Sequence, residues 1–314
     1  MSTRRGVGSA SFGPLLLATA ILAGCVLPRA AGAQDLEPRS YANTPVGLNF
    51  LIAGYAYQEG DVVTDPSLPL EDAQVTVHNA VLAYARSFGL LGRSGKVDVI
   101  VPYAWVDGSA TVLGRPEKRI VDGFADPRLR VSYNFYGAPA LTLPAFLEYQ
   151  QDLVVGASFQ MTMPLGQYDE KRLVNIGTNR WSFKPELGIS KTVGPVTVEV
   201  APSLTLYTDN DDFFGGTTRR QDPRYAVQGH LIYRFGAPLW GSIDGTYYGG
   251  GRTSIDGREN DDDQSNARVG ITLALSMTRH HSIKLYGSKA VATRVGGDFD
   301  LLGFALQYRW GGGL

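Results

Sequence analysis

The 314-residue sequence contains one cysteine, four methionines and only 19% charged residues. Its formal net charge of -1 lacks the basic field that nucleic-acid binding requires, so we expect no nucleic-acid partner. After residue 33, no apolar run approaches the roughly 18 residues that a membrane helix needs. If the mature chain lies in a membrane, its spanning elements are therefore strands.

The sequence also lacks the motifs of catalysis and cofactor binding. It contains no G-x-S-x-G, no P-loop and no dinucleotide fingerprint in a strand-to-helix context. The acidic clusters at 209–212 and 261–263 lack the spacing of a calcium loop, and solvated loop charge explains them better. The four histidines are expected to lie in a turn or in a polar wall rather than to act as bases: His78, His230, His280 and His281. The sequence predicts no enzyme, no cofactor and no metal site.

The N-terminus has the pattern of an export signal. Arg4 and Arg5 precede an apolar stretch, 14–27, and a small-residue run ends at Ala33. We therefore predict a signal peptide over 1–33 that is removed after Ala33. A second interpretation stays open, because the residues before Cys25 resemble a lipobox whose cysteine would be acylated and kept. Under the first interpretation the mature protein has no cysteine, which suits an oxidising compartment.

Abundant glycine and tyrosine, 38 and 16 residues, are typical of the many turns and interfacial aromatics of a barrel. Segments of period-2 character follow one another from residue 46 onward, separated by breaks rich in Gly, Pro, Asp and Asn. They predict a transmembrane antiparallel up-and-down β-barrel over 46–314, preceded by a short periplasmic segment over 34–45. The twelve predicted strands are 46–57, 74–87, 96–107, 124–136, 150–163, 180–191, 196–208, 224–235, 239–249, 266–277, 282–290 and 299–310.

The lengths of the breaks alternate along the chain. Long breaks at 58–73, 108–123, 164–179, 209–223 and 250–265 alternate with short ones at 88–95, 192–195, 236–238 and 278–281, and two breaks, 137–149 and 291–298, are of medium length. Outer-membrane barrels have short periplasmic turns and long extracellular loops, so this alternation predicts that both termini are periplasmic. The last segment, 299–310, resembles the C-terminal strand by which the outer-membrane assembly machinery recognises its substrates. Its alternating Leu306, Tyr308 and Trp310 carry that likeness.

The polar face of the strands supplies candidate pore residues. Because alternate residues of a strand point to opposite faces, we predict which charged residues face inward, and this set is mainly basic. The pore-lining candidates are Arg86, Arg128, Arg130, Lys184, Glu186, Arg234, Arg268 and Arg309. The other inward charges are Asp98, Glu199, Asp244 and Lys284. An open lumen of this kind would favour anions or aromatic acids. Alternatively, the same charges pair across a filled lumen. Phe213 and Phe214, adjacent in a polar loop, are candidates for a constriction.

Four stretches carry a resemblance to one family, the outer-membrane transporters of the MetA pathway of phenol degradation. They are DLEPRSYANTPVGLNFLIAGYAY (35–57), DPSLPLEDAQV (65–75), VNIGTNRWSFKPELGISK (174–191) and TDNDDFFGG (208–216). The resemblance implies a β-barrel and the passage of small aromatic or hydrophobic molecules. It carries over no catalytic or binding residue.

These observations favour an outer-membrane channel of a Gram-negative bacterium that passes small, aromatic or hydrophobic solutes by passive diffusion. The expected partners are outer-membrane lipid, lipopolysaccharide, the assembly machinery and the solute. A structural or adhesion barrel is the first alternative, and an outer-membrane lipid-modifying enzyme is the second. A continuous cavity with inward basic residues would favour the channel, and a lumen closed by salt bridges would favour the structural role.

Overall fold

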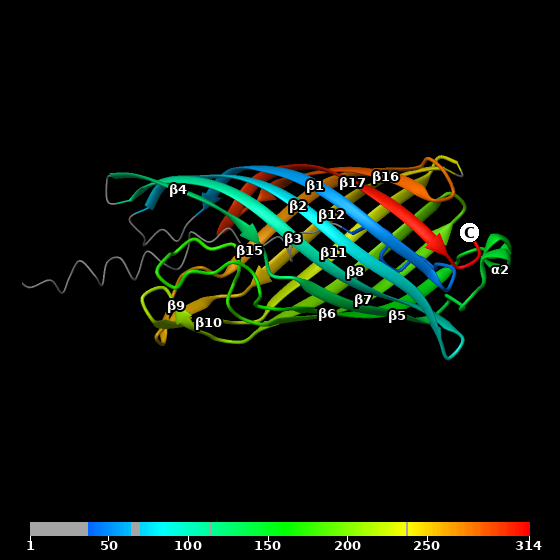
Figure 1. Cartoon of the computed structure of the whole chain (residues 1–314), viewed down its shortest axis with the longest axis horizontal. Coiled ribbons are helices and arrows are strands. Elements are labelled where there is room, and N and C mark those ends of the chain that lie inside the picture. The colour runs from blue at the N-terminus through cyan, green and yellow to red at the C-terminus, as the bar shows by residue number, and fades with distance from the viewer. Residues whose placement is uncertain (1–36, 64–69, 113–114, 237) are drawn as a thin grey trace, which may run out of the picture.

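Period-2 alternation and short connections place successive strands side by side, and in the computed structural model they close into an antiparallel barrel (Figure 1). The structure describes residues 37–63, 70–112, 115–236 and 238–314, so the predicted signal peptide and the Cys25 alternative lie outside the described residues. The barrel strands are β1 (Leu48–Val63), β2 (Leu70–Leu90), β3 (Arg93–Val112), β4 (Arg115–Phe124), β5 (Arg128–Tyr136), β6 (Leu153–Thr162), β7 (Ser182–Val193), β8 (Val196–Tyr207), β11 (Arg224–Arg234), β12 (Leu239–Gly250), β15 (Gln264–Ser276), β16 (His281–Ala292) and β17 (Gly296–Gly311).

The barrel has twelve strand positions, as predicted, because β4 and β5 share one position. Both pair with β3, β4 along Tyr103 to Val112 and β5 along Gly95 to Ile100. The interruption falls at 125–127, where Pro127 has no N–H to donate to a ladder. Pairing of β1 with both β2 and β17 closes the cylinder.

Strand ends differ from the predicted breaks mainly on the extracellular side. β1 continues to Val63 and β3 continues to Val112, so the breaks at 58–73 and 108–123 are largely strand. Within 209–223 and 250–265 the chain forms a separate four-stranded sheet of β9 (Asn210–Phe213), β10 (Thr217–Gln221), β13 (Thr253–Ile255) and β14 (Arg258–Glu259). A helix, α2 (Leu143–Glu148), lies at the opposite end, beside the C-terminus (Figure 1).

The outer face is an apolar belt. Alternate side chains of the strands are large, hydrophobic and exposed, among them Leu82, Leu187, Leu231, Ile271 and Leu302. The predicted outward sets of β6, β7, β11 and β15 are the exposed ones, and their neighbours in sequence are more buried. No helix in the described part of the chain has the length and hydropathy to cross a membrane. An exposed apolar outer face on a closed barrel indicates that the barrel is surrounded by the hydrocarbon of a lipid bilayer.

Adjacent leucines on β17 test this assignment of faces. Leu302 is 70% exposed on the outer face, whereas Leu301 lines the interior. We expect Leu302→Arg to lower the free energy of unfolding by about 2 to 4 kcal/mol, because it places a charge in the hydrocarbon. Leu301→Arg, which points into the lumen, should be tolerated. Urea unfolding in lipid vesicles measures both, and equal losses would contradict the assignment.

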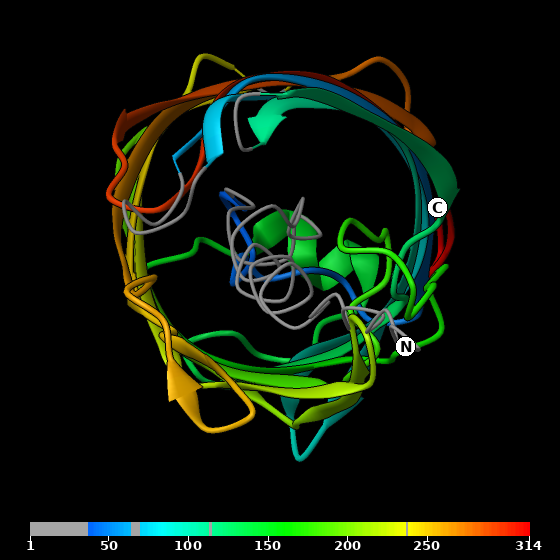
Figure 2. The same ribbon diagram turned by 90° about the vertical axis from the view of Figure 1, so that its left-hand side faces the viewer.

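The chain before β1 lies inside the barrel. Figure 2, viewed along the barrel, shows this segment within the ring of strands. The described residues of the predicted periplasmic segment, 37–45, hydrogen-bond to inward side chains of several strands. We call residues 37–45 the N-terminal plug. Its placement differs from the predicted periplasmic location because its charged and aromatic side chains find partners on the lumen wall.

Candidate functional site: a plugged, two-sided lumen

Glu37 attaches the plug to two walls of the lumen. Its carboxylate accepts a hydrogen bond from Arg130, and its backbone N–H donates to Oε1 of Gln228 on β11 at 3.3 Å. Arg130 also donates to Asp98 on β3 at 2.7 Å. Burial alone would raise the pKa of Glu37, but the charge of Arg130 and its hydrogen bond hold that pKa below the usual range of a glutamate. The contact is therefore an ion pair rather than a neutral hydrogen bond.

Arg39 attaches the plug to a different part of the wall. Its backbone N–H donates to Glu199 at 2.7 Å, and its guanidinium lies 5.2 Å from the ring centre of Trp240. Glu199 is 3% exposed and also accepts a hydrogen bond from Ser190 at 2.9 Å. A cation over an indole ring adds about 0.5 to 2 kcal/mol in such a partly desolvated place. The two attachments hold the plug at β5 and β11 and at β8 and β12.

Tyr41 occupies a slot formed by two glycines. Gly156 on β6 and Gly188 on β7 are paired in register, and both face the lumen. A Cβ at Gly188 would lie 2.0 Å from Cε2 of Tyr41, and one at Gly156 would lie 2.8 Å from its Cδ1. The hydroxyl of Tyr41 donates to Glu186 at 2.9 Å. The slot exists because glycine leaves the backbone uncovered, which lets an aromatic ring lie against it.

The plug leaves the lumen at the periplasmic end. Asn43 donates through its side chain to the carbonyl of Pro139 at 3.1 Å. Its backbone N–H donates to Gln151 at 3.1 Å. Val46 then donates to the carbonyl of Leu141 at 2.9 Å, immediately before β1 begins. The connection between β5 and β6, residues 137–152, therefore holds the plug at the periplasmic end, just before the chain continues into β1.

Beside the plug the lumen contains a cavity of about 590 Å³, and one side of it is apolar. This apolar wall comes from β1, β2 and β3, whose inward residues are mostly valine, isoleucine and alanine. Val77, Ala104 and Val106 pack there with Ile176, which comes from the segment after β6. These strands are thus apolar on both faces, which is typical of a lumen that holds hydrophobic solutes rather than a water-filled pore.

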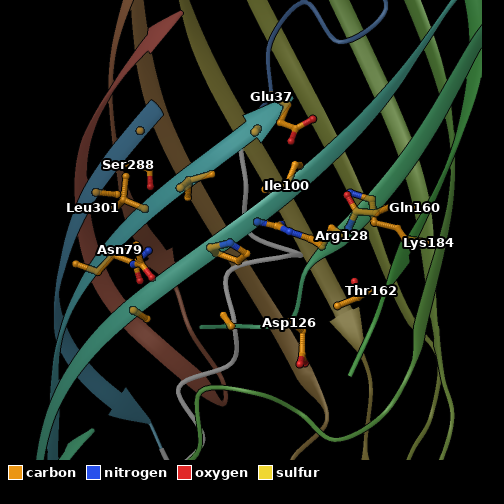
Figure 3. Close-up of a pocket in the computed structure, with 18 of the residues that line it drawn as sticks. Glu37, Asn79, Ile100, Asp126, Arg128, Gln160, Thr162, Lys184, Ser288 and Leu301 are labelled. Carbon is orange, nitrogen blue, oxygen red and sulfur yellow. The ribbon is translucent and has the colours of Figure 1, made fainter. Parts of the chain in front are cut away.

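The other side of the cavity is polar and basic. Figure 3 shows Gln160, Thr162 and Lys184 on one side of the cavity and Leu301 on the other, with Arg128 between them. Lys184 forms an ion pair with Glu186 at 3.3 Å. The cavity is therefore two-sided, with a mainly apolar surface on β1 to β3 and charge on β5 to β7 and on Lys96 and Asp98 of β3.

The predicted pore-lining residues divide into three groups. Arg128, Arg130 and Lys184 line the cavity, and Glu186 is buried beneath the plug. Arg268 is 2% exposed, and its guanidinium donates to the carbonyl of Phe299 at 2.7 Å, so it lies within the wall. The others do not line the cavity: Arg234, Arg309 and Arg86.

Arg234 and Arg309 lie on the inward-facing parity of β11 and β17, at the periplasmic ends of those strands. Arg309 donates to the carbonyl of Arg279 in the adjacent turn at 2.6 Å. The inward prediction for Arg86 is wrong, because it shares the exposed face of β2 with Leu82 and Tyr84. Around Arg86 the lumen-facing side chains of β2 are the apolar ones, so a polar side chain does not identify the lumen-facing side of this strand.

The prediction of a diphenylalanine constriction is also wrong. Phe213 is 2% exposed, and the guanidinium of Arg219 lies 5.3 Å from its ring centre within the β9–β10 hairpin. Phe214 is the next residue, and neither ring lines the cavity. Phe213 packs within the extracellular sheet, where the hairpin brings Arg219 over its ring, and Phe214 lies in the turn that follows β9.

The buried histidine does not form a catalytic triad. Nδ1 of His230 lies 2.8 Å from Asp244, and the hydroxyl of Ser242 donates to the same carboxylate at 3.1 Å. A serine nucleophile must instead hydrogen-bond to the histidine. His78 faces outward and hydrogen-bonds to Tyr55 at 2.5 Å. No group of His, Cys, Asp and Glu in the described ranges could hold a metal ion.

The sequence interpretation missed the plug and the apolar wall. Glu37, Arg39 and Tyr41 precede the first strand, where no periodicity marks a role. Lys96, whose ammonium donates to the carbonyl of Ser40 at 2.7 Å, was also missed. The one available signal was the inward set of β2, which is apolar except for Asn79 and therefore resembles a strand that is buried on both faces.

The chain forms a closed twelve-stranded barrel with an apolar outer belt and an internal lumen. These features define an outer-membrane β-barrel protein. Its family is shown by sequence. Residues 56–308 match the family described as "Putative MetA-pathway of phenol degradation", and the chain belongs to this family. The resemblance that the sequence carries is thereby confirmed. A comparison with curated protein sequences gave no match.

Among solved structures, several outer-membrane barrels are similar to this chain. The COG4313 outer membrane channel from Pseudomonas putida F1 superposes with a TM-score of 0.76 at 21% identity, covering 88% of this chain and 100% of that one. The KdgM porin aligns with a TM-score of 0.46 at 10% identity, over 82% and 98%. The β domain of the Bordetella autotransporter BrkA aligns with a TM-score of 0.48 at 11% identity, over 85% and 99%. The first similarity supports the barrel architecture.

Proposed function

We propose that this protein is a channel through which small aromatic or hydrophobic solutes cross the outer membrane by passive diffusion, and that it is not an enzyme. The observation that carries the proposal is the cavity of about 590 Å³ inside the barrel, with a wall of valine, isoleucine and alanine. A barrel serving only as structure gains nothing from such a space, because a closely packed interior is the more stable one. Membership in a phenol-degradation family and the similarity to an outer membrane channel agree with this proposal.

The plug gives the channel its selectivity. Hydrophilic solutes and ions meet the plug and the charged groups that hold it, whereas an apolar solute has a surface on β1 to β3 to bind. Weak binding at several places along a wall permits both entry and release. A purely structural barrel is the second candidate, and the ion pair between Glu37 of the plug and Arg130 of the wall favours it. The same ion pair also serves a channel that is closed at rest.

Solute uptake into liposomes tests the proposal. Ala305 on β17 faces the cavity, and Ala53 beside it on β1 faces outward. We expect Ala305→Trp to reduce uptake of 2-naphthalenesulfonate, an aromatic anion that crosses lipid slowly, by at least fivefold. Ala53→Trp adds the same bulk to the outer face and should leave uptake unchanged. Wild-type uptake equal to that of empty liposomes would remove the channel and leave the structural barrel.

The contacts of the barrel with its surroundings belong to the same proposal. The apolar belt contacts outer-membrane lipid, and lipopolysaccharide surrounds the extracellular loops. The C-terminal strand β17, which ends in the outward pair Tyr308 and Trp310, is the element that the assembly machinery recognises. Removing both aromatic rings should slow membrane insertion without changing the inward face.

A further inference from the structure

Lys284 is a cation of the cavity that forms no ion pair with a carboxylate in the described part of the chain. It lies on β16 and faces the lumen, where it lines the cavity. Its neighbours in register are Ala274 on β15 and Ala305 on β17, so neither adjacent strand offers it an acid. The charge of Lys284 helps to lower the pKa of Glu37, but that carboxylate is already held in an ion pair by Arg130. Lys184, by contrast, has an ion pair of its own with Glu186.

An aromatic ring fixes the position of the Lys284 ammonium. Nζ lies 5.4 Å from the ring centre of Tyr286, two residues along the same strand. Tyr286 in turn lies flat across Gly303 of β17, where a Cβ would be 2.5 Å from the tyrosine Cζ. The ring supplies a weak cation–π attraction and no negative charge. The ammonium is thus held in place but not neutralised.

The apolar wall of the cavity begins two strands from Lys284. β17 leads directly to β1, whose inward residues Phe50 and Ile52 line the same cavity. An ammonium beside apolar groups pays a desolvation penalty unless an anion neutralises it. The arrangement of one cation at the edge of a hydrocarbon wall matches a molecule with one anionic end and one apolar end.

On the basis of the proposed channel function, we propose that Lys284 binds the carboxylate of an amphiphilic monoanion, an aryl- or alkyl-carboxylate, whose apolar part lies on β1 to β3. A single ammonium suits a single negative charge better than a phosphate dianion, which proteins bind with several donors. Lys284 then selects acids over the corresponding neutral alcohols. The cavity wall contributes to the binding of both.

Calorimetric titration of the full-length protein in lipid nanodiscs tests this assignment, with 4-phenylbutyrate and 4-phenylbutanol as probes and empty nanodiscs as the blank. We expect the wild type to bind the acid more tightly than the alcohol. Lys284→Met should weaken binding of 4-phenylbutyrate by about tenfold and change binding of 4-phenylbutanol by less than twofold. Lys284→Arg, which keeps the charge, should retain most of the preference.

Lys289→Met is the matched control. Lys289 lies on the same strand, faces outward and pairs with Asp300 at 3.2 Å, so its loss should leave both affinities unchanged. Equal wild-type affinity for acid and alcohol, or an equal loss of both in Lys284→Met, would overturn the carboxylate site. Neither result would contradict the proposed channel function, because the liposome assay tests solute passage independently of this preference.

Discussion

Gly188→Val should release the plug and raise the single-channel conductance at least twofold. The valine side chain would occupy the space of the Tyr41 ring, since even a Cβ there would lie 2.0 Å from Cε2 of that ring. Valine suits a strand, so the ladder between β6 and β7 should remain. Without its slot, Tyr41 also loses the hydrogen bond to Glu186. Conductance in planar bilayers measures the opening directly.

A second signal and a control accompany that variant. Trp240 lies under Arg39 of the plug, so its fluorescence should change when the plug leaves. Gly229→Val is the control, because a Cβ at Gly229 meets nothing within 4 Å and faces outward. If Gly188→Val conducted like Gly229→Val and the wild type, the slot would not hold the plug.

Arg130→Met should lower the free energy of unfolding by about 3 kcal/mol, at the lower end of the cost of breaking a buried ion pair. The guanidinium joins Glu37 of the plug to Asp98 of the wall, and its removal leaves two carboxylates close together. The side chain of Asp98 is only 8% exposed, so water replaces the lost partner poorly. Urea unfolding in lipid vesicles measures the loss.

Removing the two acids as well should recover most of that loss. The triple variant Arg130→Met, Glu37→Gln and Asp98→Asn has no uncompensated charge at the junction. Lys289→Met, which breaks an exposed pair with Asp300, should cost no more than about 1 kcal/mol. A triple variant as unstable as Arg130→Met would show that packing, and not charge, is lost.

The architecture was predictable because every second residue of a lipid-facing strand must be apolar, and this alternation is visible in the sequence. In β15, Val269, Ile271, Leu273 and Leu275 alternate with residues that are buried, and the structure has the same alternation. Twelve such segments yielded the strand count. Boundaries failed where strands extend beyond the membrane, as in β3, because no lipid-facing pattern is required there.

The inner face was predictable only where polarity differs between the faces. Arg128, Arg130 and Lys184 lie on strands with a polar interior, and they line the cavity as expected. On β2 both faces are largely apolar, so Arg86 was assigned to the wrong side. The apolar interior that defeats the parity argument is the feature that supports the proposed function.

The plug could not be predicted from local sequence. Its residues have no secondary structure beyond turns, and their contacts lie far along the chain, such as Glu37 with Gln228 and Tyr41 with Glu186. For the same reason, the local sequence does not distinguish an open lumen from a filled one. The structure contains both features, with an ion pair at the plug and a cavity beside it.

Deleting residues 37–44 tests the central claim most directly, because these residues form the part of the plug that lies in the lumen. Single-channel conductance of the deletion variant and of the wild type would be compared in planar bilayers under the same salt. The account predicts a small wild-type conductance and a several-fold larger one for the deletion variant, with the barrel still folded. Equal conductances from two folded barrels would contradict the claim that the N-terminal segment closes the lumen.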